Sequence, residues 1–297
     1  GKDGKALFQR LAGGSWKPVF DAEDVKPENG YDVYTTLDVN IQDVAETALM
    51  RQLIDREAEF GSVIVMEVKS GEIKAISNLQ RNKSGNGYGE NYNFAIGDQG
   101  STEPGSTFKM LSMLALLEEN KISLNDKVET GNGVHMFYNR AMRDAKNGGY
   151  GTITIREAFE KSSNVAISKL VDQYFGSSPS KFMSYIEKAG LNEPFDFQLA
   201  GEGKPFFKKP GTKTWYGTSL PWISIGYESK LNPLHTLALY NAVANNGKMV
   251  KPYIIKAISK GNAIQESFQP EILRNQIASK KTIKQLQELL EGVVSRG

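Results

Sequence analysis

The chain has 297 residues, and its 36 basic and 34 acidic side chains leave a formal net charge of only +2. No long run of one charge sign occurs, so we expect no nucleic-acid partner, because phosphate binding needs a concentrated basic surface. The chain has no cysteine, which excludes disulfides, thiolate nucleophiles and cysteine-based zinc sites, and no stretch reaches the ~18 apolar residues of a membrane span.

The N-terminal region is predicted to lead into one folded domain. Residues 1–30 contain glycines and prolines and little periodicity, so they are interpreted as a linker or as the end of a preceding N-terminal domain. Residues 31–37 alternate like a short strand. Asp38 then offers an N-cap to a helix whose apolar residues recur through Leu53. The domain is therefore placed at residues 31–297.

A β-hairpin is the clearest strand prediction. Residues 63–68 and 72–77 are rich in β-branched side chains and flank the turn Lys-Ser-Gly at 69–71. The first strand is apolar almost throughout, which is typical of a strand covered by helices on both faces. Residues 80–93 are polar and glycine-rich and are interpreted as a solvated surface loop, because no P-loop lysine context follows.

The rest of the chain is predicted to be mainly helical. Thr154 and Glu157 form a capping box at the start of one helix. Apolar periodicity and flanking caps predict helices at residues 110–117, 155–159, 165–175, 179–189, 233–244 and 282–294. Two segments that contain glycines, residues 127–151 and 192–224, are predicted to be loops.

The strongest candidate site lies in residues 103–109, Glu-Pro-Gly-Ser-Thr-Phe-Lys. The Pro-Gly pair delivers Ser106 to the start of the predicted helix, and Lys109 follows at i+3 on the same helical face. A hydroxyl at a helix N-terminus lies in a field that favours developing negative charge. The pattern predicts a serine nucleophile activated by a lysine. The alternative is a capping serine beside a solvated surface lysine.

Similar short patterns elsewhere carry less weight. A second Ser-x-x-Lys, from Ser178 to Lys181, is predicted to be a helix cap, and Ser84-Gly85-Asn86 is a chance Ser-x-Asn. In contrast, Ser162-Ser163-Asn164 falls in a predicted turn between two helices, because serine and asparagine favour caps and turns. This turn is the candidate second part of the site.

The histidines support no other chemistry. His235 stands at the start of an apolar helix, where a satisfied, partly buried histidine is expected. A Ser-His-Asp triad has no positive support, and metal binding has less. No cofactor and no metal site are predicted.

Taken together, the chain resembles a penicillin-binding protein transpeptidase, a family whose motifs are Ser-x-x-Lys, a Ser-x-Asn element and Lys-Thr-Gly. The resemblance is strongest to the monofunctional, membrane-anchored class B group, especially its cell-division enzymes, although Glu228 replaces a glycine that is common there. The segments that carry it are residues 36–42, 103–109, 161–165, 224–227, 232–234 and 244–247.

The resemblance implies an α/β (α+β) fold of the serine β-lactamase and transpeptidase type, with a five-stranded antiparallel sheet between helices. No Lys-Thr-Gly occurs in this chain, and the nearest string, Lys213-Thr214-Trp215, has a tryptophan where substrate needs space. We therefore expect a fragment cut before its third motif, with three strands beyond Gly297. Its sheet would be incomplete or repaired by self-association.

The resemblance also implies a function and residue roles. Ser106 would attack the carbonyl between the terminal two D-alanines of a peptidoglycan stem peptide, after neutral Lys109 takes its proton. Ser162 would relay a proton to the leaving amine, and Asn164 would hold Lys109 and the substrate amide. β-Lactams would acylate Ser106 in the same way. Because the third motif is missing, this activity is expected of the parent protein, and the fragment itself is not assigned it.

Further expectations follow from the family alone. The parent would be anchored by an N-terminal helix outside this chain, would act in the periplasm or on the outer face of the inner membrane, and would contact other cell-division proteins. Two alternatives stay open: a β-lactamase or β-lactam sensor domain, and a non-catalytic division scaffold.

Overall fold

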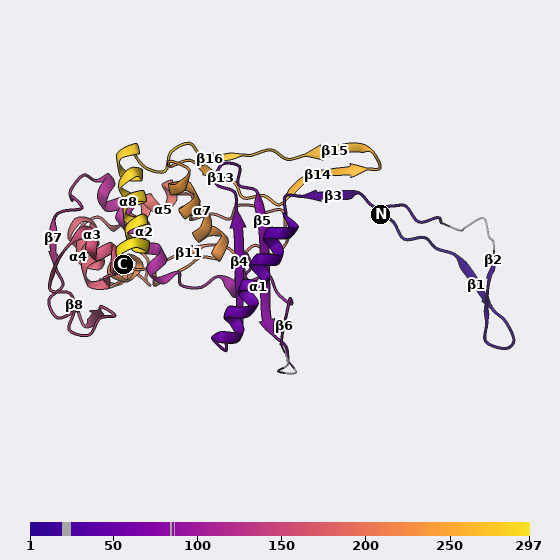
Figure 1. Cartoon of the computed structure of the whole chain (residues 1–297), viewed down its shortest axis with the longest axis horizontal. Helices are drawn as coiled ribbons and strands as arrows, with labels where there is room; N and C mark the ends of the chain where they lie inside the picture. The colour runs from indigo at the N-terminus through magenta and orange to yellow at the C-terminus, as the bar shows by residue number, and fades with distance from the viewer. Residues whose placement is uncertain (20–24, 84, 86) are drawn as a thin grey trace. The chain divides into compact units, whose positions relative to one another are not determined.

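The computed structural model describes residues 1–19, 25–83, 85 and 87–297, which form two compact units (Figure 1). Unit 1 comprises residues 1–36 and 254–269, and unit 2 comprises residues 37–253 and 270–297. Ser84 and Asn86 of the chance Ser-x-Asn string lie outside the described residues. The domain boundary at residue 31 stays a prediction.

Unit 1 consists of antiparallel strands in its described part. A hairpin pairs the first two strands, and a separate three-stranded sheet has the order β15-β14-β3. The strands are β1 (Leu7–Arg10), β2 (Trp16–Val19), β3 (Asp32–Thr35), β14 (Ile255–Lys260) and β15 (Ala263–Ser267). The predicted strand at 31–37 is confirmed as β3. The interpretation of residues 1–30 as a linker or the end of a preceding domain stays a prediction. These residues do contain β1 and β2, which were not predicted because such mostly exposed strands show no buried face to reveal them.

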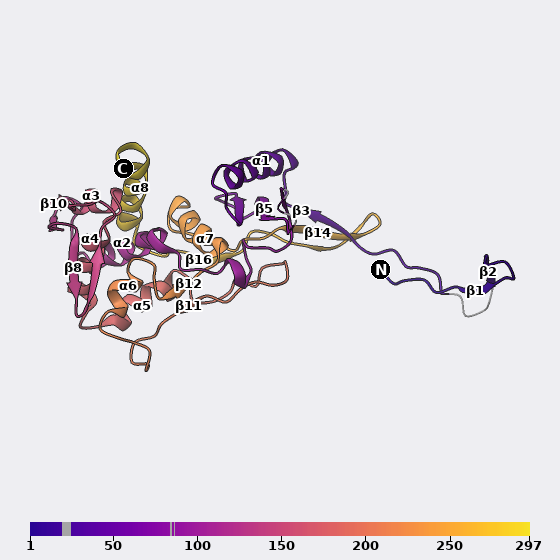
Figure 2. The same ribbon diagram turned by 90° about the horizontal axis from the view of Figure 1, so that it is seen from below.

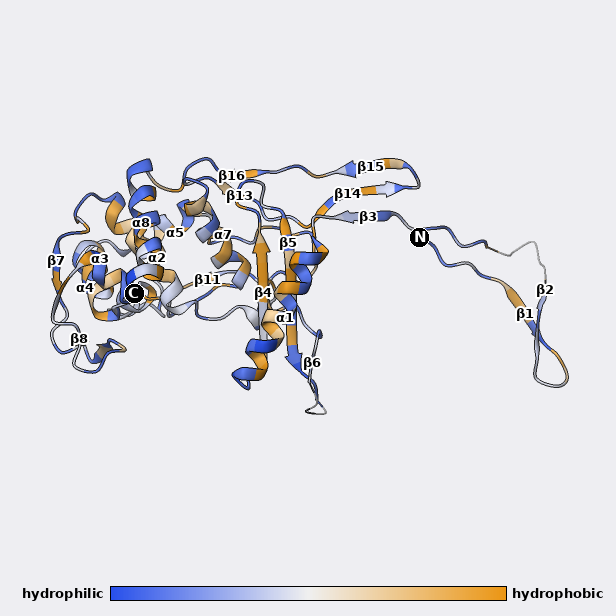
Figure 3. Ribbon diagram, in the orientation of Figure 1, coloured by the Kyte–Doolittle hydropathy of each residue, from blue (hydrophilic) through white to orange (hydrophobic). Residues whose placement is uncertain are grey.

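The predicted hairpin forms the main sheet of unit 2. Its strands are β4 (Phe60–Met66) and β5 (Ile73–Arg81), and the two-residue β6 (Tyr88–Gly89) extends the order to β4-β5-β6. Gly71 closes the turn with a φ of +82°, a conformation that glycine adopts readily. β4 is most apolar over residues 63–66, toward the tip of its arrow (Figure 3), and these residues are only partly buried.

Helices contact both faces of this sheet, as predicted. On one face, a Cβ at Gly61 would lie 3.0 Å from Leu53 and 3.1 Å from Leu49 of α1 (Val39–Asp55). Figures 1 and 2 show α1 lying along the sheet. Because side chains alternate along a strand, Ile64 points to the opposite face, where it lines a cavity shared with α7 (Pro233–Ala244).

The predicted start of α1 is also confirmed. The Asp38 carboxylate accepts hydrogen bonds from the backbone N–H groups of Asn40 and Ile41. This cap satisfies donors that the first helical turn leaves unpaired.

The other half of unit 2 is mainly helical, and each predicted helix is present. At its centre lies α2, of whose ten residues all but one are buried, and α2 packs against α4, α5 and α8. The helices are η1 (Asp98–Gly100), η2 (Gly105–Phe108), α2 (Lys109–Glu118), α3 (Ile155–Glu160), α4 (Asn164–Phe175), α5 (Pro179–Lys188), α6 (Ser219–Ile223) and α8 (Lys280–Arg296). No helix among the described residues has the length and apolar character needed to cross a membrane.

Short strand pairs connect these helices and correct two loop predictions. Residues 127–151 contain three strands, and residues 192–224 contain α6 and one strand. The strands pair as β7 with β10, β8 with β9, β11 with β12 and β13 with β16. They are β7 (Lys127–Glu129), β8 (Val134–Phe137), β9 (Arg140–Arg143), β10 (Thr152–Thr154), β11 (Phe206–Phe207), β12 (Ser229–Lys230), β13 (Met249–Val250) and β16 (Ile272–Arg274). Strands this short carry too few residues for a periodic signal.

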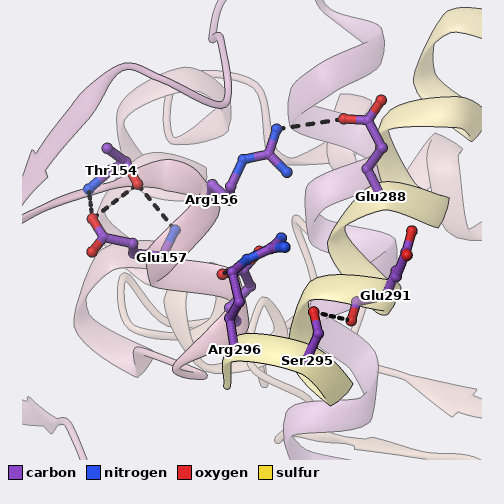
Figure 4. Close-up of polar contacts among 8 residues, drawn as sticks. Thr154, Arg156, Glu157, Glu288, Glu291, Ser295 and Arg296 are labelled. Carbon is purple, nitrogen blue, oxygen red and sulfur yellow. Dashed lines mark hydrogen bonds and ion pairs between the residues drawn. The ribbon is translucent and has the colours of Figure 1, made fainter.

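Polar contacts dock α8 on α3 (Figure 4). The predicted capping box of Thr154 and Glu157 is present at the start of α3. Arg156 lies 3.4 Å from Glu288, and Arg296 lies 2.6 Å from Glu160. Gly292 of α8 faces the Glu160 carboxylate. A Cβ at this position would lie 2.0 Å from Glu160 Oε1, so a larger side chain would clash with it.

Candidate active site

Ser106 lies in a single 3₁₀ turn that runs directly into α2. The turn is η2, and Lys109 is the first residue of α2, so the serine precedes the lysine by one turn, as predicted. Residues three apart eclipse one another in a 3₁₀ helix. The Ser106 side chain is exposed, and no hydrogen bond among the described residues joins it to Lys109.

Two glycines hold the loop before Ser106 in place. The Gly105 N–H donates to the Gly226 carbonyl at 3.1 Å. A Cβ on Gly226 would lie 2.1 Å from the Gly105 oxygen, so only glycine allows this close approach.

Lys109 connects the two predicted motifs. Its side chain is buried, and Nζ donates to the Ser162 carbonyl at 2.7 Å and to Ser162 Oγ at 2.9 Å. Ser162 is exposed and has a φ of +56° in the turn between α3 and α4. The structure therefore brings together two of the four candidate residues, across 53 positions of sequence.

The environment of Lys109 suits a proton acceptor. Burial lowers its pKa from 10.5 to about 8, while the negative charge of Asp144 acts against this shift. At pH 7 a group with such a pKa is neutral in about a tenth of the molecules, whereas an ordinary lysine is almost fully charged.

Asn164 contacts a hairpin rather than the lysine. It is the first residue of α4, and its Nδ2 donates to the Arg143 carbonyl at 2.8 Å. Ser163 supplies the N-cap of α4 through a 3.0 Å hydrogen bond from the Ala166 N–H. The hydrogen bonds of Ser163 and Asn164 thus both fix the end of the turn that carries Ser162.

Asp144 is a residue that the sequence analysis missed. Its carboxylate accepts from the Ser163 hydroxyl at 2.9 Å and from the Val165 N–H at 3.0 Å, and its charge acts on Lys109. Asp144 follows β9, inside a region predicted to be a loop. No spacing pattern marks it, because the β8–β9 hairpin alone brings it to the α4 N-terminus.

A cavity of about 560 Å³ borders the nucleophile loop. It lies between β4 and α7, and Glu103, Pro104 and Thr107 line it on the side of Ser106. Tyr240 of α7 also lines it and donates to the Thr107 carbonyl at 3.0 Å. The cavity is therefore lined by residues that flank Ser106 in the sequence.

The weaker patterns lie elsewhere. Ser178 occupies the N-cap position of α5 as predicted, although its side chain makes no capping hydrogen bond, and Lys181 pairs with Glu119 at 2.6 Å. Thr214 of the Lys-Thr-Trp string lines a separate cavity of about 650 Å³ beside α5.

His235 is a satisfied core histidine, as predicted. Its Nδ1 lies 2.7 Å from Asn232 Oδ1, its Nε2 lies 3.0 Å from the Glu193 carbonyl, and its ring stacks on Phe195. The described residues contain no group of three or more His, Cys, Asp or Glu side chains that could hold a metal.

An exposed serine lies one turn before a buried lysine, and a second serine contacts the lysine amine. This arrangement is typical of sites in which a lysine activates a serine nucleophile. The family model described as "Penicillin binding protein transpeptidase domain" matches residues 61–297. The chain belongs to this family, and the predicted fold class is confirmed.

Individual relatives and a solved structure support the same family. Penicillin-binding protein PbpB of Mycolicibacterium smegmatis is 28% identical over 100% of this chain and 45% of its own length. Stage V sporulation protein D of Bacillus subtilis is 27% identical over 100% of this chain and 46% of its own length. The chain thus spans less than half the length of these curated relatives. The crystal structure of penicillin-binding protein 3 from Mycobacterium tuberculosis complexed with aztreonam superposes with a TM-score of 0.77 at 25% identity, covering 90% of this chain and 59% of that one.

Proposed function

We propose that this chain is part of a peptidoglycan D,D-transpeptidase that cross-links stem peptides through an acyl-enzyme on Ser106. The observation that carries the proposal is the buried Lys109 amine, with a pKa of about 8, held 2.9 Å from Ser162 Oγ. Membership of the transpeptidase family supports the same reaction.

The residues divide the chemistry between them. Neutral Lys109 takes the Ser106 proton as Oγ attacks the carbonyl between the two D-alanines, and the Ser106 N–H faces the developing oxyanion. The proton passes through Ser162 to the leaving amine, so D-alanine departs and the acyl group stays on Ser106. An amine of a second stem peptide then attacks the ester, which restores the serine. Asn164 holds the substrate amide through its carboxamide oxygen, while its Nδ2 donates to the backbone carbonyl of Arg143.

The same site takes β-lactams as donor mimics. The related penicillin-binding protein 3 has been crystallised with aztreonam and with ampicillin. In the parent protein, the domain works on the outer face of the bacterial inner membrane, held by an N-terminal anchor and beside other division proteins.

Penicillin adduct formation tests the proposal. We expect intact-mass analysis of the full-length protein to show one covalent penicillin, lost in Ser106→Ala and kept in Ser178→Ala, which removes the serine of the weaker Ser-x-x-Lys. No adduct in the full-length protein would favour a non-catalytic scaffold. Rapid turnover of a chromogenic β-lactam would favour a β-lactamase.

A further inference from the structure

Glu228 has a backbone conformation that is unusual for a residue other than glycine. Its φ is +54°, in the left-handed region that glycine adopts freely and that other residues rarely occupy. Its side chain is only 13% exposed. A buried carboxylate in such a conformation persists where its contacts over-determine it, and such positions cluster at functional sites.

The carboxylate joins two cations from separate segments. Its Oε1 lies 3.3 Å from Arg140 at the start of β9, and its Oε2 lies 2.9 Å from Lys208 after β11. Burial opposes ionisation, but hydrogen bonds with Lys208 and Ser219 and the charges of Lys208 and Arg140 hold the pKa of Glu228 below its usual range. Arg140 is fixed further by the Trp222 ring, 4.2 Å from its guanidinium.

Residues 226–228 also contact the loop that precedes Ser106, residues 103–105. The Glu228 N–H donates to Glu103 Oε1 at 2.9 Å. Two residues earlier, Gly226 accepts the hydrogen bond from Gly105. The 226–228 turn therefore holds both the start of the motif and the residue next to Ser106.

Strand β9 connects Glu228 to the second motif, residues 162–164. β9 begins at Arg140, which Glu228 holds, and ends at Arg143, whose carbonyl accepts from Asn164. The next residue, Asp144, accepts from Ser163. One short strand therefore spans the distance between Glu228 and the 162–164 turn.

We propose that Glu228 is a positioning residue that couples the Ser106 loop to the 162–164 turn through β9. The coupling stands on these contacts alone. Its effect on acylation rests on the function proposed above. Only an enzyme acylated at Ser106 needs Ser106, Lys109 and Ser162 in fixed positions relative to one another.

Hydrogen exchange of the full-length protein tests the coupling directly, using Glu228→Gly and Glu228→Gln. Glycine suits the positive φ, so it removes the carboxylate without backbone strain, and glutamine keeps the shape without the charge. We expect several-fold faster exchange in both 103–108 and 161–165. Arg140→Gln should affect 137–144 and 161–165 but spare 103–108, because the Glu228 carboxylate still pairs with Lys208 and keeps the 226–228 turn in place.

The matched control is Glu119→Gln. Glu119 is similarly buried, with 15% of its side chain exposed, and it also pairs with a lysine, but it contacts neither motif. Faster exchange confined to 206–209 and 226–230, or equal changes across unit 2 in the Glu228 and Glu119 variants, would overturn the coupling.

Acylation by penicillin gives the second readout. We expect the Glu228 variants to be acylated about tenfold more slowly, with an unchanged pH midpoint, because Asp144 and not Glu228 acts on Lys109. If the unaltered protein forms no adduct, the proposed function fails, and the exchange data still decide the coupling.

Discussion

At Lys109, burial and one nearby carboxylate shift the pKa of the same amine in opposite directions. Burial disfavours the ammonium, and Asp144 favours it. The balance leaves a base that is partly neutral near pH 7 yet keeps two hydrogen bonds to Ser162. A base poised in this range is what proton transfer from a serine requires.

The shifted lysine makes folding stability depend on pH. Its folded pKa of about 8 lies below the ~10.4 of an unfolded lysine. Between these values the unfolded chain binds more protons, so stability rises with pH across this window. We expect the unfolding free energy to gain about 2 kcal/mol between pH 7.5 and 9.5 relative to Lys109→Met.

Urea titrations at the two pH values measure this gain. Lys127→Met is the control, because Lys127 is an exposed lysine in the same unit, and it should keep the pH dependence of the unaltered chain. A Lys109→Met variant with the same pH dependence would contradict the lowered pKa.

Among the elements, α4 depends most on the residues around its first turn. The Ser163 hydroxyl caps the Ala166 N–H and also donates to Asp144, and the side chain is fully buried. Ser178 holds the same position before α5 without a capping hydrogen bond. The two serines therefore form a natural comparison.

We expect Ser163→Ala to destabilise unit 2 by about 2 kcal/mol, because it removes a cap and leaves the partly buried Asp144 carboxylate short of one donor. Ser178→Ala should change stability by less than about 0.5 kcal/mol. Denaturant midpoints of the two variants, measured side by side, give the answer. Equal effects would show that the α4 cap adds nothing to stability.

The elements that could be predicted were those whose signal is local. The Asp38 cap, the Thr154 capping box and the Asn-Pro start of α7 each lie within four residues of the helix they begin. The β8–β9 hairpin was missed, because its strands are only four residues each and the groups that it contacts outside the hairpin, Asn164 and Glu228, lie far along the chain.

Considering the whole chain, the open edge of β4 is its most consequential feature. Among the described residues β4 pairs only with β5, and Ile64 of this strand lines the cavity between β4 and α7. An unpaired strand edge next to apolar surface favours pairing with another chain.

We expect the 297-residue chain to self-associate through β4. Ile64→Lys should weaken association, because a lysine on an edge strand opposes pairing. Ile54→Lys adds the same charge on the exposed surface of α1 and should not. Sedimentation velocity over a concentration series separates these outcomes, and a chain that stays monomeric would refute the prediction.

The candidate nucleophile, its lysine and the second motif were evident from short stretches, since turn-forming residues, helical spacing and motif composition act over a few positions. Their arrangement was not. The contact of Lys109 with Ser162 and the place of Asp144 beside them needed the fold, as did the link through Glu228. Each joins groups that packing brings together from distant positions, and burial, which sets the pKa of Lys109, exists only once the chain has folded.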